Sequence, residues 1–347
     1  MRTPFIGSEA IAAGLVRKHQ LRSSFTPMFP DVYTDNAGDN LTIYHRATAA
    51  WLWSRRSGVI SGLTAASLHG AKYVEDSLPI ELVWSNRRPP PGIITNSGQL
   101  YDDIVVRGGL PTTSVIRTAH DVGRRNVGRP GALCDAVARL DALGNATGFS
   151  AAALRTFATD RHGGARGIRQ LLSALDLYDA GSQSPQETRL RLLIIRAGYP
   201  RPTTQIPVSS ADGRRQYFLD MGWEKHKLAV EYDGDHHRRD PGQFAHDIIR
   251  SEDLDELSWT RIRVVKRHRD VDVLQRLARE WARTGDPPGI DALTAHSMNS
   301  RTLPPARQAD GRTTPLPPRP RRRRPPPRCG RAAGDGLRTR SRRASPS

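Results

Sequence analysis

Two short apolar stretches in the second half of the chain, residues 216–221 and 227–233, are interrupted by acidic side chains. Both have the composition of β-strands, and the residues between them predict the turn of a hairpin. Because strand side chains alternate between faces, Glu231 and Asp233 point to the same side of the second strand. The antiparallel neighbour can bring Asp220, which ends the first apolar run, close to Glu231.

Helical patterns flank this predicted hairpin. Residues 184–197 carry an apolar stripe with helical spacing. Ser184 suits the N-cap, Pro185 suits the first helical position, and Glu187 completes a capping box. Capping alone accounts for Glu187, which can still face a nearby metal site. Downstream, the pattern predicts a helix, a strand and a basic helix over residues 243–257, 261–266 and 271–283.

The start of the chain has the order helix, turn, helix and two-stranded wing. The predicted elements are two helices over residues 8–14 and 16–23 and a wing over residues 25–34. This order is typical of a winged helix-turn-helix, whose second helix contacts a DNA groove. The basic residues placed on that helix are Arg17, Lys18, His19 and Arg22. The alternative is a small helical protein-interaction module.

The middle of the chain mixes strands and helices. Its predicted elements are a helix over residues 41–57, a strand-to-helix step over 59–70, strands over 80–84 and 104–106, and an Ala-rich helical connector over 130–177. Thr113, Arg117 and Asp121 are expected to cap and brace a helix. The expected fold is therefore a multidomain α/β (α+β) protein. We divide it into residues 1–40 (winged helix-turn-helix), 41–128 (α/β domain), 129–180 (helical connector), 181–287 (the domain of the predicted hairpin) and 288–347 (tail).

Positive charge is concentrated at the end of the chain. The 347 residues carry a net charge of +18. Residues 301–347 contain 14 Arg and two Asp, a net +12, which leaves +6 for residues 1–300. This Pro/Arg-rich segment has almost no apolar side chains, so we expect a disordered tail. Such a tail can bind nucleic acid non-specifically or can be merely solvated, and it says nothing about what the core binds.

Composition excludes several classes of protein. Two cysteines, Cys134 and Cys329, make neither a disulfide framework nor a zinc site. Met1 to Arg17 lacks the apolar core of a secretory signal, and no apolar run approaches the length of a membrane span. We therefore expect a cytoplasmic protein with no membrane partner.

The acidic residues of the predicted hairpin are candidate metal ligands. Carboxylates crowded into apolar strands repel one another unless a cation neutralises them. Ligation by oxygen atoms with open positions suits Mg²⁺ or Mn²⁺ better than Zn²⁺. The candidate ligands are Asp220, Glu231 and Asp233. The alternative is that Glu231 and Asp233 form the solvated face of an edge strand.

Taken together, these patterns resemble the very-short-patch-repair-like (Vsr-like) branch of the restriction-endonuclease-like, PD-(D/E)XK nuclease superfamily. That branch is marked by S-x-x-E on a first helix, an Asp ending a strand, E-x-D-G-x-x-H, and D-x-x-R on a helix. The matching positions are Glu187, Asp220, Glu231, Asp233, His237, Asp247 and Arg250. The resemblance covers roughly residues 184–283. It implies a mixed sheet flanked by helices, dependence on Mg²⁺ and hydrolysis of phosphodiester bonds in DNA.

One departure from the wider superfamily concerns the general base. The E-x-K lysine is absent, and Asp233 stands in its place. Relatives that share E-x-D-G often lack that lysine too, and His237 is the candidate base here. The residues expected at the site are Glu187, Asp220, Glu231, Asp233 and His237, with Arg250 and Lys266 on the phosphate.

The N-terminal half is similar to a second family. Residues 5–125 resemble the N-terminal half of abortive-infection AbiEi-type antitoxin regulators. The resemblance is carried by S-E-A-I-A-A-G-L, the V-Y after the wing, I-S-G-L-T-A-A-S-L-H-G and T-S-V-I-R-T-A-H-D. It implies DNA binding or regulation and not catalysis.

The sequence thus predicts a metal-dependent DNA endonuclease with an N-terminal winged-helix DNA-binding domain, acting in repair, restriction or defence. The alternative is a non-catalytic DNA-binding regulator of antitoxin type whose nuclease-like half has become structural. DNA is the expected partner, and Mg²⁺ or Mn²⁺ is the expected cofactor. A homodimer is left open.

Overall fold

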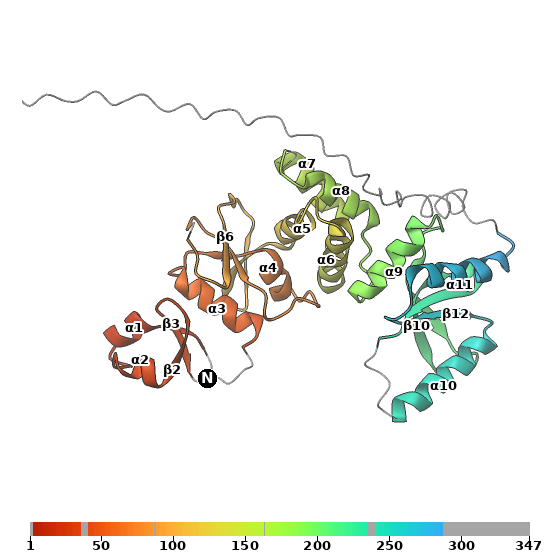
Figure 1. Cartoon of the computed structure of the whole chain (residues 1–347), viewed down its shortest axis with the longest axis horizontal. Coiled ribbons are helices and arrows are strands. Elements are labelled where there is room, and N and C mark those ends of the chain that lie inside the picture. Colours follow the sequence, from red (N-terminus) through yellow and green to blue (C-terminus); the bar gives the residue numbers. More distant parts are fainter. Residues whose placement is uncertain (1–2, 36–40, 87, 163, 235–240, 287–347) are drawn as a thin grey trace, which may run out of the picture. The chain divides into compact units, whose positions relative to one another are not determined.

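A computed structural model describes most of the chain (Figure 1). The described ranges are residues 3–35, 41–86, 88–162, 164–234 and 241–286. They form a mixed α/β protein with eleven α-helices and three sheets. No helix within these ranges is both long and apolar enough to cross a bilayer. The predicted tail over residues 288–347 lies outside the described residues.

The first sheet is small and antiparallel, with strand order β1-β3-β2. Its strands are Phe5–Ile6, Phe25–Phe29 and Val32–Asp35, and its helices are α1 (Gly7–Ala12) and α2 (Gln20–Ser23). Ile6 and Val32 pack against Ala49 and Leu52 of the following helix. This packing buries one face of the sheet. Along the chain, α1 and α2 precede β2 and β3, which is the order of elements that the sequence predicts.

The second predicted helix is shorter than the apolar pattern suggests. Residues 16–19 form turns and bends, and α2 begins only at Gln20. Leu15 is exposed and Leu21 is buried, so the earlier residues offer no apolar stripe to bury. The N–H of Arg17 instead donates to Gln20 Oε1 at 2.7 Å. The prediction of a helix over residues 16–23 is therefore wrong in its first half.

The second sheet has the strand order β6-β5-β4-β8-β7 and mixes parallel with antiparallel pairs. Its strands are β4 (Val59–Ile60), β5 (Ile80–Val83), β6 (Ile93–Asn96), β7 (Ile104–Arg107) and β8 (Leu110–Thr113). Two helices, α3 (Ile43–Trp53) and α4 (Gly62–Leu68), pack on it around Ile60, Ile80 and Leu82. The sequence pattern predicts β4, β5 and β7 but neither β6 nor β8.

A cluster of helices follows this sheet. Its members are α5 (Val115–Gly123), α6 (Ala132–Thr147), α7 (Ala151–His162) and α8 (Ile168–Leu177). They bury Leu140, Leu143, Leu154 and Leu171 in one apolar core. This confirms the predicted helical character of residues 130–177.

The third sheet has the strand order β12-β11-β10-β9. Its strands are β9 (Thr203–Ser209), β10 (Gln216–Trp223), β11 (Leu228–Tyr232) and β12 (Thr260–Val264), with a 3₁₀ turn, η1 (Glu224–His226), inside the hairpin. β9, β10 and β11 are antiparallel neighbours, whereas β11 and β12 run parallel. The predicted hairpin is therefore present, inside a mixed sheet.

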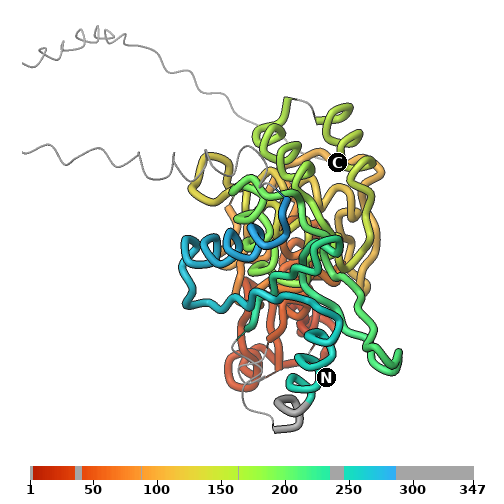
Figure 2. Tube along the Cα trace, turned by 90° about the vertical axis from the view of Figure 1, so that its right-hand side faces the viewer, coloured from red at the N-terminus to blue at the C-terminus, as the bar shows by residue number. Residues whose placement is uncertain are grey.

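Helices cover both faces of this third sheet (Figures 1 and 2). On one face, α9 (Pro185–Arg196) and α11 (Asp270–Ala282) pack on Leu228 and Val230. On the other face, Leu254 of α10 (Pro241–Glu256) packs on Ala229. Since side chains alternate, Glu231 shares the α10 face with Ala229.

A buried ion pair joins α9 to the helical cluster. The side chains of Arg191 in α9 and Asp141 in α6 are 0% and 1% exposed, and Arg191 Nη2 lies 2.7 Å from Asp141 Oδ2. Thr188 Oγ1 and the N–H of Asp179 also donate to this carboxylate, each at 2.8 Å. Burial raises the pKa of Asp141 to about 6, against the opposing charge of Arg191. These contacts fix α9 to α6 as well as to the sheet.

Candidate functional site

The register of the hairpin brings Asp220 to Glu231. Met221 pairs with Val230 in the antiparallel ladder, so Asp220 and Glu231 are the next residues along the two strands. The N–H of Tyr232 donates to Asp220 Oδ2 at 2.7 Å. The adjacency predicted from strand alternation is therefore found.

Asp220 lies at an irregularity in the sheet. The ladder between β9 and β10 pairs the residues on both sides but not Asp220 with Gln205, which has φ 49°. Leu219 consequently belongs to the core on the α10 face, whereas Met221 belongs to the core on the α9 face. A regular strand would place both on one side. The break in alternation centres on the acidic residue.

Glu187 is held in a capping box at the start of α9. Ser184 Oγ accepts from the N–H of Glu187 at 3.1 Å and donates to Glu187 Oε1 at 2.9 Å, and the N–H of Gln183 donates to Glu187 Oε2 at 2.8 Å. The predicted capping role of Glu187 is confirmed. Burial raises the pKa of this carboxyl, although the hydrogen bonds from Gln183 and Ser184 act to lower it.

The electrostatics of Asp220 connect three carboxylates. Burial and then the negative charge of Glu187 raise the pKa of Asp220 to about 7, with Glu231 adding to the rise. The hydrogen bond from Tyr232 and the positive charge of Arg250 oppose it. An aspartate in water has a pKa near 3.9. The negative charges of Glu187 and Glu231 therefore both act on Asp220, and we call these three residues the acidic cluster.

Two arginines meet Glu231 on the α10 face. Arg250 Nη2 lies 2.5 Å from Glu231 Oε1 and also donates to the carbonyl of Phe218 at 2.9 Å. Arg261 Nη1 lies 3.8 Å from Glu231 Oε2. The predicted site thus gains Arg261, which the sequence analysis missed. Arg261 is the register partner of Ala229, so its place on the face of Glu231 follows from strand pairing that the sequence alone does not supply.

The remaining candidates lie elsewhere. Asp233 pairs with Arg263, whose Nη2 lies 3.1 Å from Asp233 Oδ2, and Asp233 is not among the main causes of the raised pKa of Asp220. Lys266 lines a separate pocket of about 280 Å³ between α9 and β12, together with Arg189 and His268. The structure therefore does not join Asp233 or Lys266 to the acidic cluster.

Within the described ranges, no hydrogen bond or ion pair links the other predicted residues to the acidic cluster. Arg17, Lys18 and Arg22 are exposed near α2. His237 lies outside the described residues, so its predicted role as general base stays a prediction. Asp247 is half-buried on α10, three residues before Arg250.

Metal ligation is not preformed within the described ranges. No group of three or more His, Cys, Asp or Glu is arranged there to hold a metal ion. The contacts give the reason, because Arg250 and Arg261 take the oxygens of Glu231 while the capping box takes those of Glu187. Among the described residues, the cations that contact the acidic cluster are the guanidinium groups of Arg250 and Arg261, and both contact Glu231.

The raised pKa of Asp220 makes the stability of the protein depend on pH. The folded protein binds a proton at Asp220 more tightly than the unfolded chain does between about pH 4 and pH 7. The free energy of unfolding therefore falls as pH rises through this window. We expect Asp220→Asn to raise the free energy of unfolding at pH 8 by about 2 to 4 kcal/mol and to leave it nearly unchanged at pH 4.

Urea unfolding at both pH values measures this effect. Asp102→Asn is the matched control, because Asp102 is exposed outside the acidic cluster. Identical pH profiles for wild type and Asp220→Asn would contradict the assignment of Asp220 as a destabilised charge.

Comparisons with known proteins find two mycobacterial relatives in sequence and one solved structure. No family model matches the chain. The chain is 28% identical over 203 residues to two proteins of Mycobacterium tuberculosis, uncharacterized protein MT2308 of strain CDC 1551 and uncharacterized protein Rv2248 of strain H37Rv. The aligned part covers 58% of this chain and 72% of each relative. A crystal structure of the RV2827C protein from the same species aligns with 62% of this chain and 86% of its own, at 15% identity and a TM-score of 0.35.

Proposed function

We propose that residues 181–287 form a Mg²⁺-dependent DNA endonuclease domain with a restriction-endonuclease-like arrangement of the Vsr-like type. The observation that carries the proposal is the acidic cluster, in which Asp220 has a pKa of about 7 beside Glu231 and Glu187. Perturbed carboxyls of this kind are typical of functional sites. A mixed sheet with helices on both faces is the architecture that this resemblance implies.

The chemistry of the cluster fits a hard divalent cation. Such an ion prefers carboxylate oxygens, and it would relieve the repulsion that raises the pKa of Asp220. Asp220 and Glu231 would hold it, once Arg250 releases Glu231 Oε1. A bound Mg²⁺ or Mn²⁺ supplies a water of lowered pKa and stabilises charge on a phosphate.

The two arginines that contact Glu231 supply groups that bind anions next to the acidic cluster. Arg250 is partly exposed, and its contact with Glu231 is a hydrogen-bonded ion pair on the α10 face. A guanidinium group binds phosphate oxygens through two parallel hydrogen bonds. We assign Arg250 to the scissile phosphate and Arg261, which is largely buried, to holding the Glu231 side chain in its orientation.

The N-terminal residues supply the proposed DNA-binding part. We propose a winged helix-turn-helix over residues 1–40 and an AbiEi-like α/β domain over residues 41–128. The exposed side chains of Arg17, Lys18 and Arg22 are free to contact phosphates in this proposal. DNA would be the partner of both halves.

One observation favours the second candidate, a non-catalytic DNA-binding regulator. Both carboxylate oxygens of Glu187 and both of Glu231 already have partners within the protein. Asp233, which stands where the wider superfamily has the E-x-K lysine, pairs with Arg263. A nuclease-like half with only a structural role would keep such contacts.

Nicking of supercoiled plasmid separates the two candidates. The full-length protein is incubated with plasmid in Mg²⁺ and in EDTA, and then with single-stranded, duplex, mismatched and branched DNA. Nicking in Mg²⁺ alone is the expected result. The regulator is favoured if the protein retards the same DNA in gels that contain EDTA but cleaves no substrate in Mg²⁺ or Mn²⁺. That result would contradict the proposed nuclease activity.

A further inference from the structure

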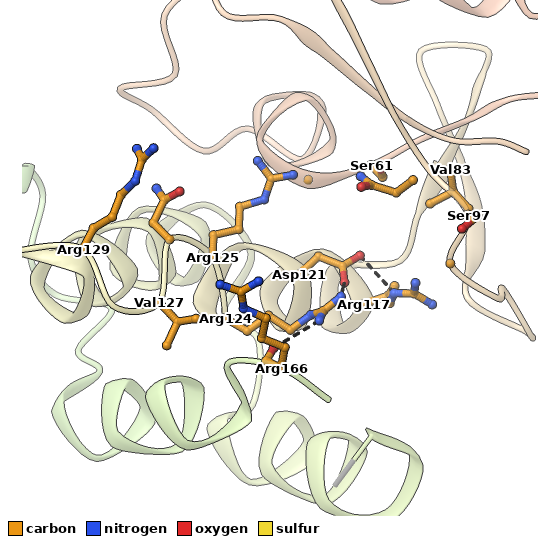
Figure 3. Close-up of a pocket in the computed structure, with 14 residues that line it drawn as sticks. Ser61, Val83, Ser97, Arg117, Asp121, Arg124, Arg125, Val127, Arg129 and Arg166 are labelled. Carbon is orange, nitrogen blue, oxygen red and sulfur yellow. Dashed lines mark hydrogen bonds and ion pairs between the residues drawn. The ribbon is translucent and has the colours of Figure 1, made fainter. Parts of the chain in front are cut away.

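A second polar site lies in the N-terminal half, between the five-stranded sheet and the helical cluster (Figure 3). It is an open cavity of about 680 Å³. Its walls come from the β4–α4 junction, the end of β6, α5 with the segment that follows it, and the loop before α8. The arginines that line it are Arg117, Arg124, Arg125, Arg129 and Arg166. We call it the arginine pocket.

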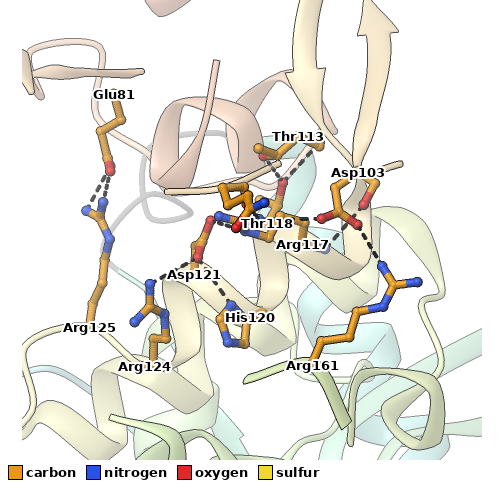
Figure 4. Close-up of polar contacts among 12 residues, drawn as sticks. Glu81, Asp103, Thr113, Arg117, Thr118, His120, Asp121, Arg124, Arg125 and Arg161 are labelled. Carbon is orange, nitrogen blue, oxygen red and sulfur yellow. Dashed lines mark hydrogen bonds and ion pairs between the residues drawn. The ribbon is translucent and has the colours of Figure 1, made fainter. Parts of the chain in front are cut away.

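Three of these arginines are fixed by carboxylates (Figure 4). Arg117 Nε donates to Asp121 Oδ2 at 3.0 Å, and Arg124 Nη2 lies 3.4 Å from Asp121 Oδ1. Arg125 Nη1 donates to Glu81 Oε1 at 2.8 Å. These contacts hold the guanidinium groups in place before any ligand arrives, which reduces the cost of ordering them on binding.

Positive charge remains in excess after these pairs are formed. Arg129 and Arg166 are exposed, and neither guanidinium contacts a carboxylate among the described residues. The five arginines face Asp121, Glu81 and Asp103, which leaves a net charge of +2. Burial and then the charge of Arg139 lower the pKa of Arg125 to about 10. The pocket therefore carries excess positive charge, which an anionic ligand would balance.

Two buried polar atoms in the wall also lack a partner. Ser61 is 2% exposed, and its Oγ has no hydrogen-bond partner within the protein. Arg124 Nε is buried without a partner as well. Buried polar groups are nearly always hydrogen-bonded, so an orphaned hydroxyl in the wall of a cationic cavity indicates an absent acceptor or donor.

The start of α4 is already neutralised and is not the site. Glu81 Oε1 accepts from the N–H of Leu63 at 2.9 Å, in the position of an anion at a helix N-terminus. Gly62 permits this approach, because it has φ 58° and a Cβ there would lie 2.1 Å from Glu81 Oε2. The excess positive charge lies instead on Arg129 and Arg166.

We propose that the arginine pocket binds an oligophosphate, meaning pyrophosphate or the phosphate chain of a nucleoside di- or triphosphate. Its volume lies within the usual range for small-molecule sites. Arginines bind phosphate oxygens in bidentate fashion, and Ser61, Asn96 and Asn126 add neutral hydrogen-bonding groups. No aromatic side chain is among the lining residues, so the pocket offers no surface on which successive bases would stack. The recognition group is therefore the phosphate chain.

Calorimetric titration of the full-length protein with pyrophosphate, and separately with ATP, tests this site at physiological salt. The test variant is Arg129→Ala/Arg166→Ala, because both side chains are exposed and neither is needed to hold the fold. The matched control is Arg155→Ala/Arg169→Ala, which removes the same charge from exposed positions of α7 and α8 outside the pocket. The basic tail is identical in all three proteins and cancels from the comparison.

Wild type is expected to bind pyrophosphate with one site per chain. The pocket variant should bind at least about tenfold more weakly, and the control within about twofold, since two charge-assisted contacts are lost only in the former. Absence of pyrophosphate binding by wild type would overturn the proposal. Equal weakening of binding in both variants would overturn it too, because the binding site would then lie outside the arginine pocket. The result does not depend on whether the protein cleaves DNA.

Discussion

Glu231→Gln is expected to lower Mg²⁺-dependent nicking by at least about 1000-fold, because it removes one of the two carboxylates that would hold the ion. Glutamine has the same shape and keeps one oxygen for Arg250, so the hydrogen bond at 2.5 Å becomes a weaker bond to an uncharged acceptor. The negative charge next to Asp220 is lost at the same time. The rate constant for loss of supercoiled plasmid measures the effect.

The control for this experiment is Glu252→Gln. Glu252 is exposed on α10, two residues beyond Arg250, and the same chemical change there should leave the rate within about twofold of wild type. Urea unfolding of all three proteins separates loss of catalysis from loss of fold. A well-folded Glu231→Gln protein that nicks as fast as wild type would exclude Glu231 from the chemistry.

Arg191→Met is expected to lower the free energy of unfolding by about 3 to 5 kcal/mol. Removal of Arg191 leaves Asp141 buried at 1% exposure without its cation. It also leaves Ser182 Oγ and the carbonyl of Leu177 without their arginine donor. Equilibrium unfolding in urea at pH 8 measures this loss.

The double variant Arg191→Met/Asp141→Asn isolates the charge. Because asparagine cannot ionise, the double variant should recover a large part of the stability lost in Arg191→Met. The single variant should also be less defective at pH 5 than at pH 8, since the raised pKa of Asp141 lets it protonate there. A double variant as unstable as the single one would mean that the arginine stabilises through packing and not through its charge.

Local patterns account for the parts of the site that the sequence predicted. The capping box fixes Glu187 within four residues, and strand alternation with a short turn places Asp220 beside Glu231. Both inferences need only nearby residues and regular geometry. The same regularity misled the prediction for residues 16–23, where helical composition does not supply a buried stripe.

Contacts between distant segments were not predictable in this way. The approach of Arg250 to Glu231 depends on how α10 packs on the sheet, and Arg261 joins them through parallel pairing of β11 with β12. The broken alternation at Asp220 depends on the left-handed backbone of Gln205, in a strand that the pattern did not predict.

The arginine pocket was even less predictable from the sequence than the contacts of Glu231. The sequence analysis expected Arg117 and Asp121 to brace a helix, and the ion pair between them confirms this. Their convergence with Arg166 and Ser61 at one cavity arises from separate parts of the chain and depends on the tertiary fold.

The most direct test of the proposed metal site is calorimetric titration of Mg²⁺ and of Mn²⁺ into the full-length protein with a DNA oligonucleotide present. Wild type should bind at least one ion per chain that the Asp220→Asn/Glu231→Gln double variant does not bind, while the Glu252→Gln control matches wild type. Equal ion binding by wild type and the double variant, or none by either, would contradict the assignment of the acidic cluster as a metal-dependent nuclease site.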